Sequence, residues 1–271
     1  MFVRGGPYYR AVLEVIDKGA VSETHPAPVL FVHGAWHAAW CWDEHFLDFF
    51  ASRGYRAVAL SLQGHGHSGT SKPLRALSFD DYLQDITAVA DTLATPPIVV
   101  GHSMGGFLVQ KYLEHHSAPA AVLMASMPPT GYLASGLRWL RRHPWHFAKV
   151  SITGRSLPYV STPPLARERF FSPQTPEALV RRYAARIQEE SARSGLDGLR
   201  NLPRPDAITT DLLVLGALDD GAVTREEVRA TAQAYRVEPQ FFPLMGHNMM
   251  LEPSWESVAN RIHEWLLARG L

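Results

Sequence analysis

The run Val-Val-Gly-His-Ser-Met-Gly-Gly, residues 99–106, constrains the fold of this chain more than any other segment. It contains the pattern G-x-S-x-G between an apolar stretch at 97–100 and a helix-forming stretch at 107–116. In that context the pattern predicts a strand, a sharp turn and a helix, with the Ser103 hydroxyl projecting above the end of the strand. The glycines leave out side chains that such close strand–helix packing cannot accommodate. We therefore predict that Ser103 is a nucleophile; the alternative is a plain turn.

Short apolar stretches alternate with helical patterns along most of the chain, which predicts a mostly parallel sheet flanked by helices on both faces. Strands are expected at 8–16 (at the sheet edge), 28–32, 55–62, 97–100, 120–127, 211–216 and 240–244. Helices are expected at 40–53, 78–93, 107–116, 224–235 and 254–269. Ser78 and Asp81 have the spacing of a capping box at the start of the second helix.

This alternation stops between residues 128 and 205, a segment rich in Arg, Pro and Trp with helical patterns near 135–142 and 176–194. Because it is too long for a loop of a compact domain, we predict a helical cap over 128–205, inserted into a core formed by 1–127 and 206–271. The cap carries 13 Lys or Arg and 5 Asp or Glu, against 13 and 21 in the rest. One interpretation of this excess positive charge is that it attracts anionic substrates or lipid headgroups. The other, which we prefer, is that it docks the cap on the acidic core.

Length and composition limit the number of domains, the partners and the cellular compartment that can be expected. With 271 residues, of which 46% are hydrophobic and 19% charged, the chain can form one large domain. Its 26 basic and 26 acidic residues balance, so no nucleic-acid partner is indicated. We expect a cytoplasmic protein without stable membrane insertion, because neither a signal-peptide pattern nor a long apolar run is present. The single cysteine, Cys41, is expected to pack in the core.

Reactive side chains follow several of the predicted strands. Asp219 and Asp220 come after the strand at 211–216, and His247 follows the strand at 240–244. Because the carboxyl ends of parallel strands share one edge of a sheet, these residues are expected near Ser103. A serine hydroxyl needs a base, and the base needs a carboxylate to orient it. We predict His247 as the base and either aspartate as the acid.

An oxyanion that forms over Ser103 requires two hydrogen-bond donors. The backbone N–H of Met104 is one candidate, because it follows the nucleophile, and the N–H of Ala35 in the loop after the strand at 28–32 is the other. We expect His33 to brace that loop and His65 and His67 to be structural. Few acidic or cysteine ligands lie near these histidines, so no metal site is predicted. Trp36 and Met127, at strand ends, are predicted to line the substrate pocket.

Five segments carry motifs of one known family: HGAW at 33–36, GHGHS at 64–68, GHSMGG at 101–106, DD at 219–220 and GH at 246–247. Through them the chain resembles the α/β-hydrolase superfamily. The loop at 33–42 is similar to that of plant methylesterases and hydroxynitrile lyases, and the stretch at 246–253 is similar to bacterial carboxylesterases and lysophospholipase-like members. The resemblance implies an α/β-hydrolase fold, with a mostly parallel twisted sheet and an inserted cap.

The same resemblance implies a serine esterase. Asp220 is placed like the acid of that family, so the triad would be Ser103, Asp220 and His247, acting on a small-molecule ester without a cofactor. Lactone or thioester cleavage would use the same residues. The alternatives are hydroxynitrile lyase activity, with Lys149 as the lysine able to reach the pocket, C–C bond hydrolysis or other chemistry of this fold, and a ligand-binding member without turnover.

Overall fold

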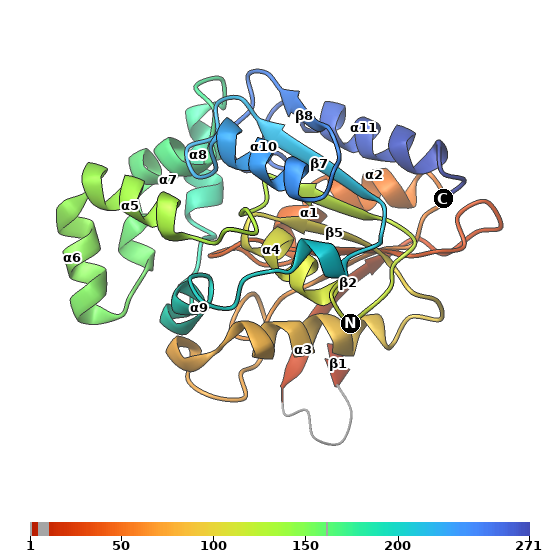
Figure 1. The fold of residues 1–271 in the computed structure, drawn as a ribbon, viewed down its shortest axis with the longest axis horizontal. Coiled ribbons are helices and arrows are strands. Elements are labelled where there is room, and N and C mark those ends of the chain that lie inside the picture. Colours follow the sequence, from red (N-terminus) through yellow and green to blue (C-terminus); the bar gives the residue numbers. More distant parts are fainter. Residues whose placement is uncertain (1, 5–10, 161) are drawn as a thin grey trace.

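One twisted sheet organises the computed structural model, which describes residues 2–4, 11–160 and 162–271 (Figure 1). Within those residues the sheet has eight strands in the order β1-β2-β4-β3-β5-β6-β7-β8. Strands β3 to β8 are mutually parallel, whereas β1 and β2 pair antiparallel. The strands are β1 (Phe2–Arg4), β2 (Val12–Lys18), β3 (Val29–Val32), β4 (Ala57–Leu60), β5 (Ile98–His102), β6 (Ala121–Met124), β7 (Leu212–Ala217) and β8 (Pro239–Phe242).

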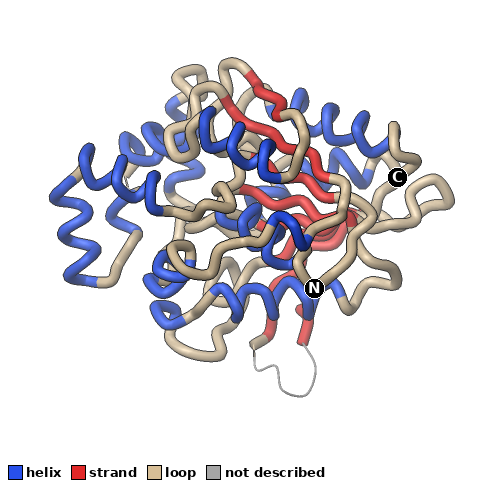
Figure 2. The backbone as a smooth tube through the Cα atoms, in the orientation of Figure 1, coloured by secondary structure: helices blue, strands red, loops and turns tan. Residues whose placement is uncertain are grey.

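Helices cover both faces of the sheet, as Figure 2 shows. The alternation of side chains along each strand builds two cores: Phe31 points into one, and its neighbour Leu30 points into the other. Helices α1 (Trp40–Asp43), α2 (Phe46–Ala51) and α11 (Trp255–Leu267) contribute to the first core. Helices α3 (Phe79–Ala90), α4 (Met104–Tyr112) and α10 (Arg225–Ala234) contribute to the second.

A helical insertion separates β6 from β7 and lies beyond the carboxyl ends of the parallel strands (Figure 1). It contains α5 (Leu133–Arg142), α6 (Pro144–Thr153), α7 (Pro163–Phe170), α8 (Glu177–Ala184) and α9 (Ala192–Asp197). Single turns of 3₁₀ helix occur at Leu74–Ala76, Leu157–Tyr159 and Pro205–Ala207. No helix among the described residues is long and apolar enough to cross a bilayer.

The predicted fold class is confirmed, but several predicted elements need correction. The helix expected at 40–53 is two short helices, because His45 between them leaves the helical conformation with φ −148° and ψ −50°. The strand expected at the edge over 8–16 is β2, which β1 covers; residues 8–10 lie outside the described part. The capping box of Ser78 and Asp81 is present at α3.

The insertion was predicted least well. The pattern at 176–194 divides into α8 and α9, and the pattern at 135–142 corresponds to α5. Helices α6 and α7 were missed; each has a proline in its first turn, where the absent N–H costs no hydrogen bond.

Candidate active site

Ser103 sits on a strained turn between β5 and α4. Its backbone has φ 54° and ψ −118°, a conformation that side-chain-bearing residues rarely adopt. The Ser103 N–H donates to the Met124 carbonyl at 3.1 Å, and the Ser103 carbonyl accepts from the Met127 N–H at 3.1 Å. These bonds hold the turn against the end of β6, while the Ser103 side chain stays partly exposed. Strain of this kind is kept where the surroundings over-determine it, and it is common at active sites.

The loop after β3 lies directly against this turn. A methyl group on Gly34 would be 2.9 Å from Ser103 Cβ and 2.9 Å from His102 Nδ1. Among the described residues, the N–H groups of Ala35 and Met104 find no hydrogen-bond acceptor. Because Met104 opens α4, its N–H also lies at the positive end of the helix dipole. Both predicted oxyanion donors are therefore unoccupied beside the Ser103 turn.

Asp220 and His247 form a buried pair. Asp220 Oδ2 lies 2.8 Å from His247 Nδ1, and the two side chains are 2% and 1% exposed. The other oxygen, Oδ1, accepts from the N–H groups of Ala222 at 2.7 Å and Val223 at 2.8 Å. Two backbone N–H groups thus fix the carboxylate, which in turn orients the imidazole. Asp219 is exposed, so the geometry favours Asp220 as the orienting acid.

His102 attaches the His247 loop to the serine turn. Its Nε2–H donates to the His247 carbonyl at 2.9 Å, and the two rings are 4.6 Å apart. Burial holds the pKa of His102 well below its usual value, so the ring is neutral. The sequence did not indicate this role, because the partner lies 145 residues further along the chain.

Two further neutral histidines brace the Ala35 loop. His33 Nδ1–H donates to the Gly34 carbonyl at 2.8 Å, and its Nε2 accepts from the Leu62 N–H at 3.0 Å. His37 Nδ1–H donates to the Ala35 carbonyl at 2.8 Å, and its Nε2 accepts from Asn248 at 3.0 Å. Burial lowers the pKa of His33 to about 3 and that of His37 to about 4. His37 therefore connects the Ala35 loop to the loop that carries His247.

A buried carboxylate from the insertion reaches the same loop. Glu190 Oε1 accepts from Tyr82 Oη at 2.8 Å, and Oε2 lies 3.2 Å from His65 Nε2 and 3.4 Å from the Trp36 nitrogen. Burial alone would raise the pKa of Glu190, but the His65 charge and several hydrogen bonds lower it to about 2. The pKa of His65 is raised, because Glu190 outweighs the effect of burial. The pair is thus an ion pair that joins insertion and core.

Trp36, a predicted pocket residue, is held by the insertion at three points. Its carbonyl accepts from the Gln188 N–H at 2.9 Å, its N–H faces Glu190, and its indole Nε1–H donates to Ser156 Oγ at 2.9 Å. The backbone is left-handed, with φ 65°. Since Trp36 follows Ala35, these contacts also position one predicted oxyanion donor.

A second buried carboxylate fixes the His247 loop. Glu252 accepts from the N–H of Ser172 at 2.6 Å, from the hydroxyls of Ser172 and Thr175 at 2.8 Å each, and from the Gly246 N–H at 3.2 Å. Ser172 and Thr175 belong to the insertion. The sequence signal for this residue is an acidic side chain directly after the apolar run at 249–251.

The remaining predicted residues are placed as follows. Met127 is buried among residues of the second core, with 6% exposure, and its N–H holds the Ser103 carbonyl. Lys149 is exposed on α6. No three His, Cys, Asp or Glu side chains of the described residues converge as metal ligands.

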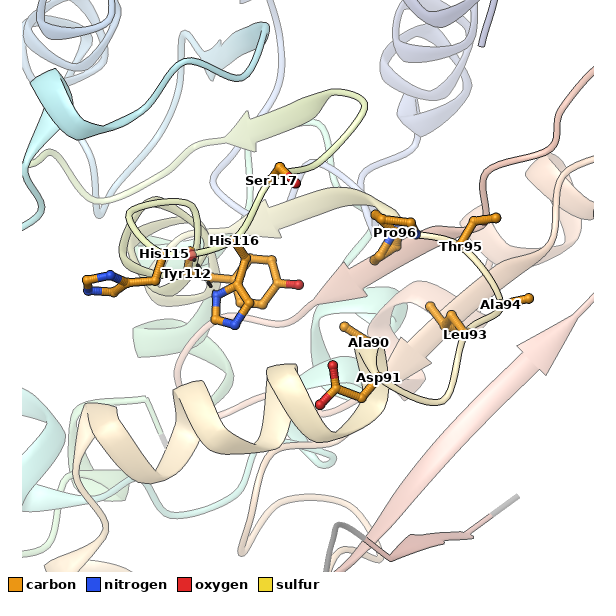
Figure 3. Close-up of a pocket in the computed structure, with 11 residues that line it drawn as sticks. Ala90, Asp91, Leu93, Ala94, Thr95, Pro96, Tyr112, His115, His116 and Ser117 are labelled. Atoms are coloured by element: carbon orange, nitrogen blue, oxygen red, sulfur yellow. Dashed lines mark hydrogen bonds between the residues drawn. The ribbon is translucent and has the colours of Figure 1, made fainter.

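A separate hollow of about 440 Å³ lies between the carboxyl-terminal ends of α3 and α4 and the segment before β5 (Figure 3). His116 stacks on Tyr112 there at 4.2 Å, and Asp91 lies across from them. This is the amino end of β5, opposite the end that carries Ser103. None of the predicted site residues lines this hollow, whereas Ser103 lies at the carboxyl end of β5.

Comparison with known proteins agrees with this architecture. A family model described as alpha/beta hydrolase family matches residues 29–261. The chain belongs to the alpha/beta hydrolase family.

Curated relatives of this alpha/beta hydrolase include esterases and haloperoxidases. It is 38% identical over 106 residues to a non-heme chloroperoxidase of Streptomyces lividans, covering 38% of this chain and 37% of that protein. It is 35% identical over 88 residues to Methylesterase 18 of Arabidopsis thaliana, covering 32% of each. The matches thus span well under half the length of these relatives. Among solved structures, an esterase from Exiguobacterium antarcticum superposes with a TM-score of 0.77 at 20% identity, covering 98% of both chains, which shows a common fold.

We predict that the Glu190→Gln variant is less stable by roughly 3 kcal/mol, because the substitution removes one member of a buried ion pair. Urea denaturation followed by circular dichroism measures the free energy of unfolding. Glu177→Gln is the matched control: Glu177 pairs with Arg167 and Arg181 at the surface, where solvent screens the pair, so its loss should cost far less than the loss of Glu190. Equal costs for the two variants would contradict the structural role given to Glu190.

The histidine braces predict a loss of stability in acid. A folded-state pKa of about 4 for His37 lies below the ordinary value near 6.5, so the unfolded chain binds the proton first. The contribution of His37 is complete above about pH 6.5 and declines as the pH falls toward 4. Between pH 7 and pH 4.5 this amounts to about 2 kcal/mol. The His37→Gln variant should therefore lose less stability than wild type over that interval in urea titrations, and parallel curves would refute the assignment.

Proposed function

We propose that this protein is a serine hydrolase that cleaves carboxylic esters of small molecules through an acyl-enzyme intermediate. The observation that carries the proposal is the buried pair of Asp220 and His247, 2.8 Å apart, on a loop bonded to the strained turn of Ser103. Such a pair supplies a base of fixed tautomer and orientation, which a serine hydroxyl requires.

In the proposed reaction, Ser103 Oγ attacks the ester carbonyl while His247 Nε2 accepts the serine proton. The N–H groups of Ala35 and Met104 stabilise the oxyanion, and both are free of other acceptors among the described residues. His247 then donates the proton to the leaving alcohol. In the second half, His247 takes a proton from water while the water oxygen attacks the acyl carbon. The bond to Ser103 Oγ then breaks, His247 returns the proton to Oγ, and the acid is released.

Trp36 and Met127 are the proposed walls of the substrate pocket. Trp36 packs near Phe170 of α7, with ring centroids 6.0 Å apart, so the insertion supplies apolar surface on that side. This surface suits an uncharged, partly apolar acyl or alcohol group. Lactones and thioesters present the same carbonyl to Ser103. The exposed position of Lys149 on α6 gives no support to the lyase alternative.

The haloperoxidase names among the relatives favour one second candidate. Hydrogen peroxide can replace water in the second half of the reaction, so that its oxygen attacks the acyl carbon and Ser103 leaves. The products are a peroxy acid and free enzyme, and the peroxy acid then oxidises a halide. Halide oxidation that requires both peroxide and a carboxylic acid or ester would identify this route.

Replacement of the nucleophile is the direct test. We expect wild type to hydrolyse p-nitrophenyl esters of some chain length between acetate and dodecanoate, and Ser103→Ala to lose at least about 10³-fold in kcat. Ser151→Ala, an exposed serine on α6, is the control and should retain full activity. A fluorophosphonate should label wild type at Ser103 only. Full activity of Ser103→Ala would refute the proposal.

The two neighbouring aspartates provide a matched test of the acid. Asp220→Asn preserves shape but removes the charge that orients His247, so kcat should fall by about 10³–10⁴-fold. Asp219→Asn alters an exposed carboxylate in the same turn and should leave kcat within about two-fold. A larger loss in Asp219→Asn than in Asp220→Asn would reverse the assignment.

A further inference from the structure

Helices α5 and α6 expose an unusual set of large apolar side chains. Trp145 is 80% exposed, Ile152 84% and Leu133 62%, whereas most aromatic residues of the chain are buried. Leu137 and Phe147 are also exposed. A concentration of such residues on two consecutive helices marks an interaction site more often than chance exposure does.

The exposed residues follow helical spacing. Trp145, Lys149 and Ile152 stand at positions i, i+4 and i+7 of α6, so they form one stripe along the helix. Leu133, Leu137 and Arg141 form a similar stripe on α5, at i, i+4 and i+8. Each helix thus presents apolar side chains next to a cation, the pattern of helices that lie in a membrane interface.

The charge of this region has one sign. No Asp or Glu occurs between Glu114 and Glu168. Two of the arginines are neutralised: Arg138 pairs with Glu227 at 2.7 Å, and Arg142 pairs with Glu168. Arg141, Lys149 and Arg155 have no carboxylate within ion-pair distance among the described residues. Three unpaired cations therefore lie within the two stripes or shortly after them in the chain.

The two helices are also placed to reach a flat surface. They form the outermost part of the insertion, away from the sheet, as the left side of Figure 1 shows. Arg138 anchors α5 to the core through Glu227 and the Ala222 carbonyl. The insertion residues that contact the Trp36 and His247 loops, such as Ser156, Ser172 and Glu190, lie outside α5 and α6.

We propose that α5 and α6 dock this protein on the surface of an anionic lipid bilayer. Trp145, Ile152 and the exposed leucines enter the headgroup boundary, and Arg141, Lys149 and Arg155 contact anionic headgroups. Neither helix spans the bilayer, because each has ten residues. A second copy of the chain fits this face less well, since a two-fold interface would bring the unpaired cations together.

Vesicle sedimentation with the full chain tests the proposal. Wild type should bind vesicles of phosphatidylcholine with about one third phosphatidylglycerol, bind pure phosphatidylcholine weakly, and release in high salt. Trp145→Ser with Ile152→Ser should weaken binding at least about ten-fold. Arg141→Glu with Lys149→Glu should do the same and abolish the preference for the anionic lipid.

The controls change exposed residues outside α5 and α6. Leu267→Ser on α11 and Arg236→Glu, which is 89% exposed, should bind vesicles as wild type does. All variants should keep wild-type unfolding curves and wild-type hydrolysis of a soluble ester, so the result is independent of the proposed esterase activity. Wild type that binds neither vesicle overturns the proposal. Equal binding of every variant to the vesicles would also overturn it. A third contradicting result would be a dimer in solution that Trp145→Ser dissociates.

Discussion

Backbone contact between the end of β3 and the start of α4 determines the geometry of the whole site. A methyl group on Gly105 would lie 2.4 Å from the carbonyl oxygens of both Val32 and His33, and one on Gly34 would lie 2.9 Å from Ser103 Cβ. Only glycine permits this approach, because any side chain would collide with backbone that cannot move aside. The contact places the Ala35 and Met104 N–H groups beside one serine. Strain at Ser103 and the bonds to β6 are consequences of the same packing.

The insertion completes this site through two buried carboxylates that cross the junction in opposite directions. Glu190 belongs to the insertion, and its partners Tyr82, His65 and the Trp36 backbone belong to the core. Glu252 belongs to the core, and it binds Ser172 and Thr175 of the insertion. Separating the two parts would expose or unpair both carboxylates at once, and unpaired buried charge is costly. The part of the insertion near the site therefore acts as a fixed wall. It is hydrogen-bonded to Trp36, the residue after Ala35, and to Asn248, the residue after His247.

Much of the site was predictable because its chemistry lies at strand ends. Ser103, His247 and the aspartate pair all follow apolar strands, and parallel strands bring such ends together whatever the loops do. The choice between Asp219 and Asp220 needed geometry, since adjacent residues differ only in the direction of their side chains. Glu190 and Glu252 were not predicted, because their partners lie far away in the sequence. His65 is 125 residues from Glu190, and Ser172 is 80 residues from Glu252. The break between α1 and α2 at His45 could not be predicted either, because the apolar pattern of residues 40–53 is that of one continuous helix.

The zero net charge of the chain conceals a division within the insertion itself. Arg182 and Arg186 pair with Glu44, and Arg204 pairs with Glu114, so part of the basic excess does dock on the acidic core, as preferred from the sequence. On α5 and α6, Arg138 still pairs with Glu227 of the core, but Arg141 and Lys149 have no such partner among the described residues, and there the exposed aromatic and aliphatic side chains gather instead. Selection for docking alone would favour pairing all the arginines and covering Trp145. The division follows naturally if the inner half of the insertion positions the site and the outer half meets a different surface.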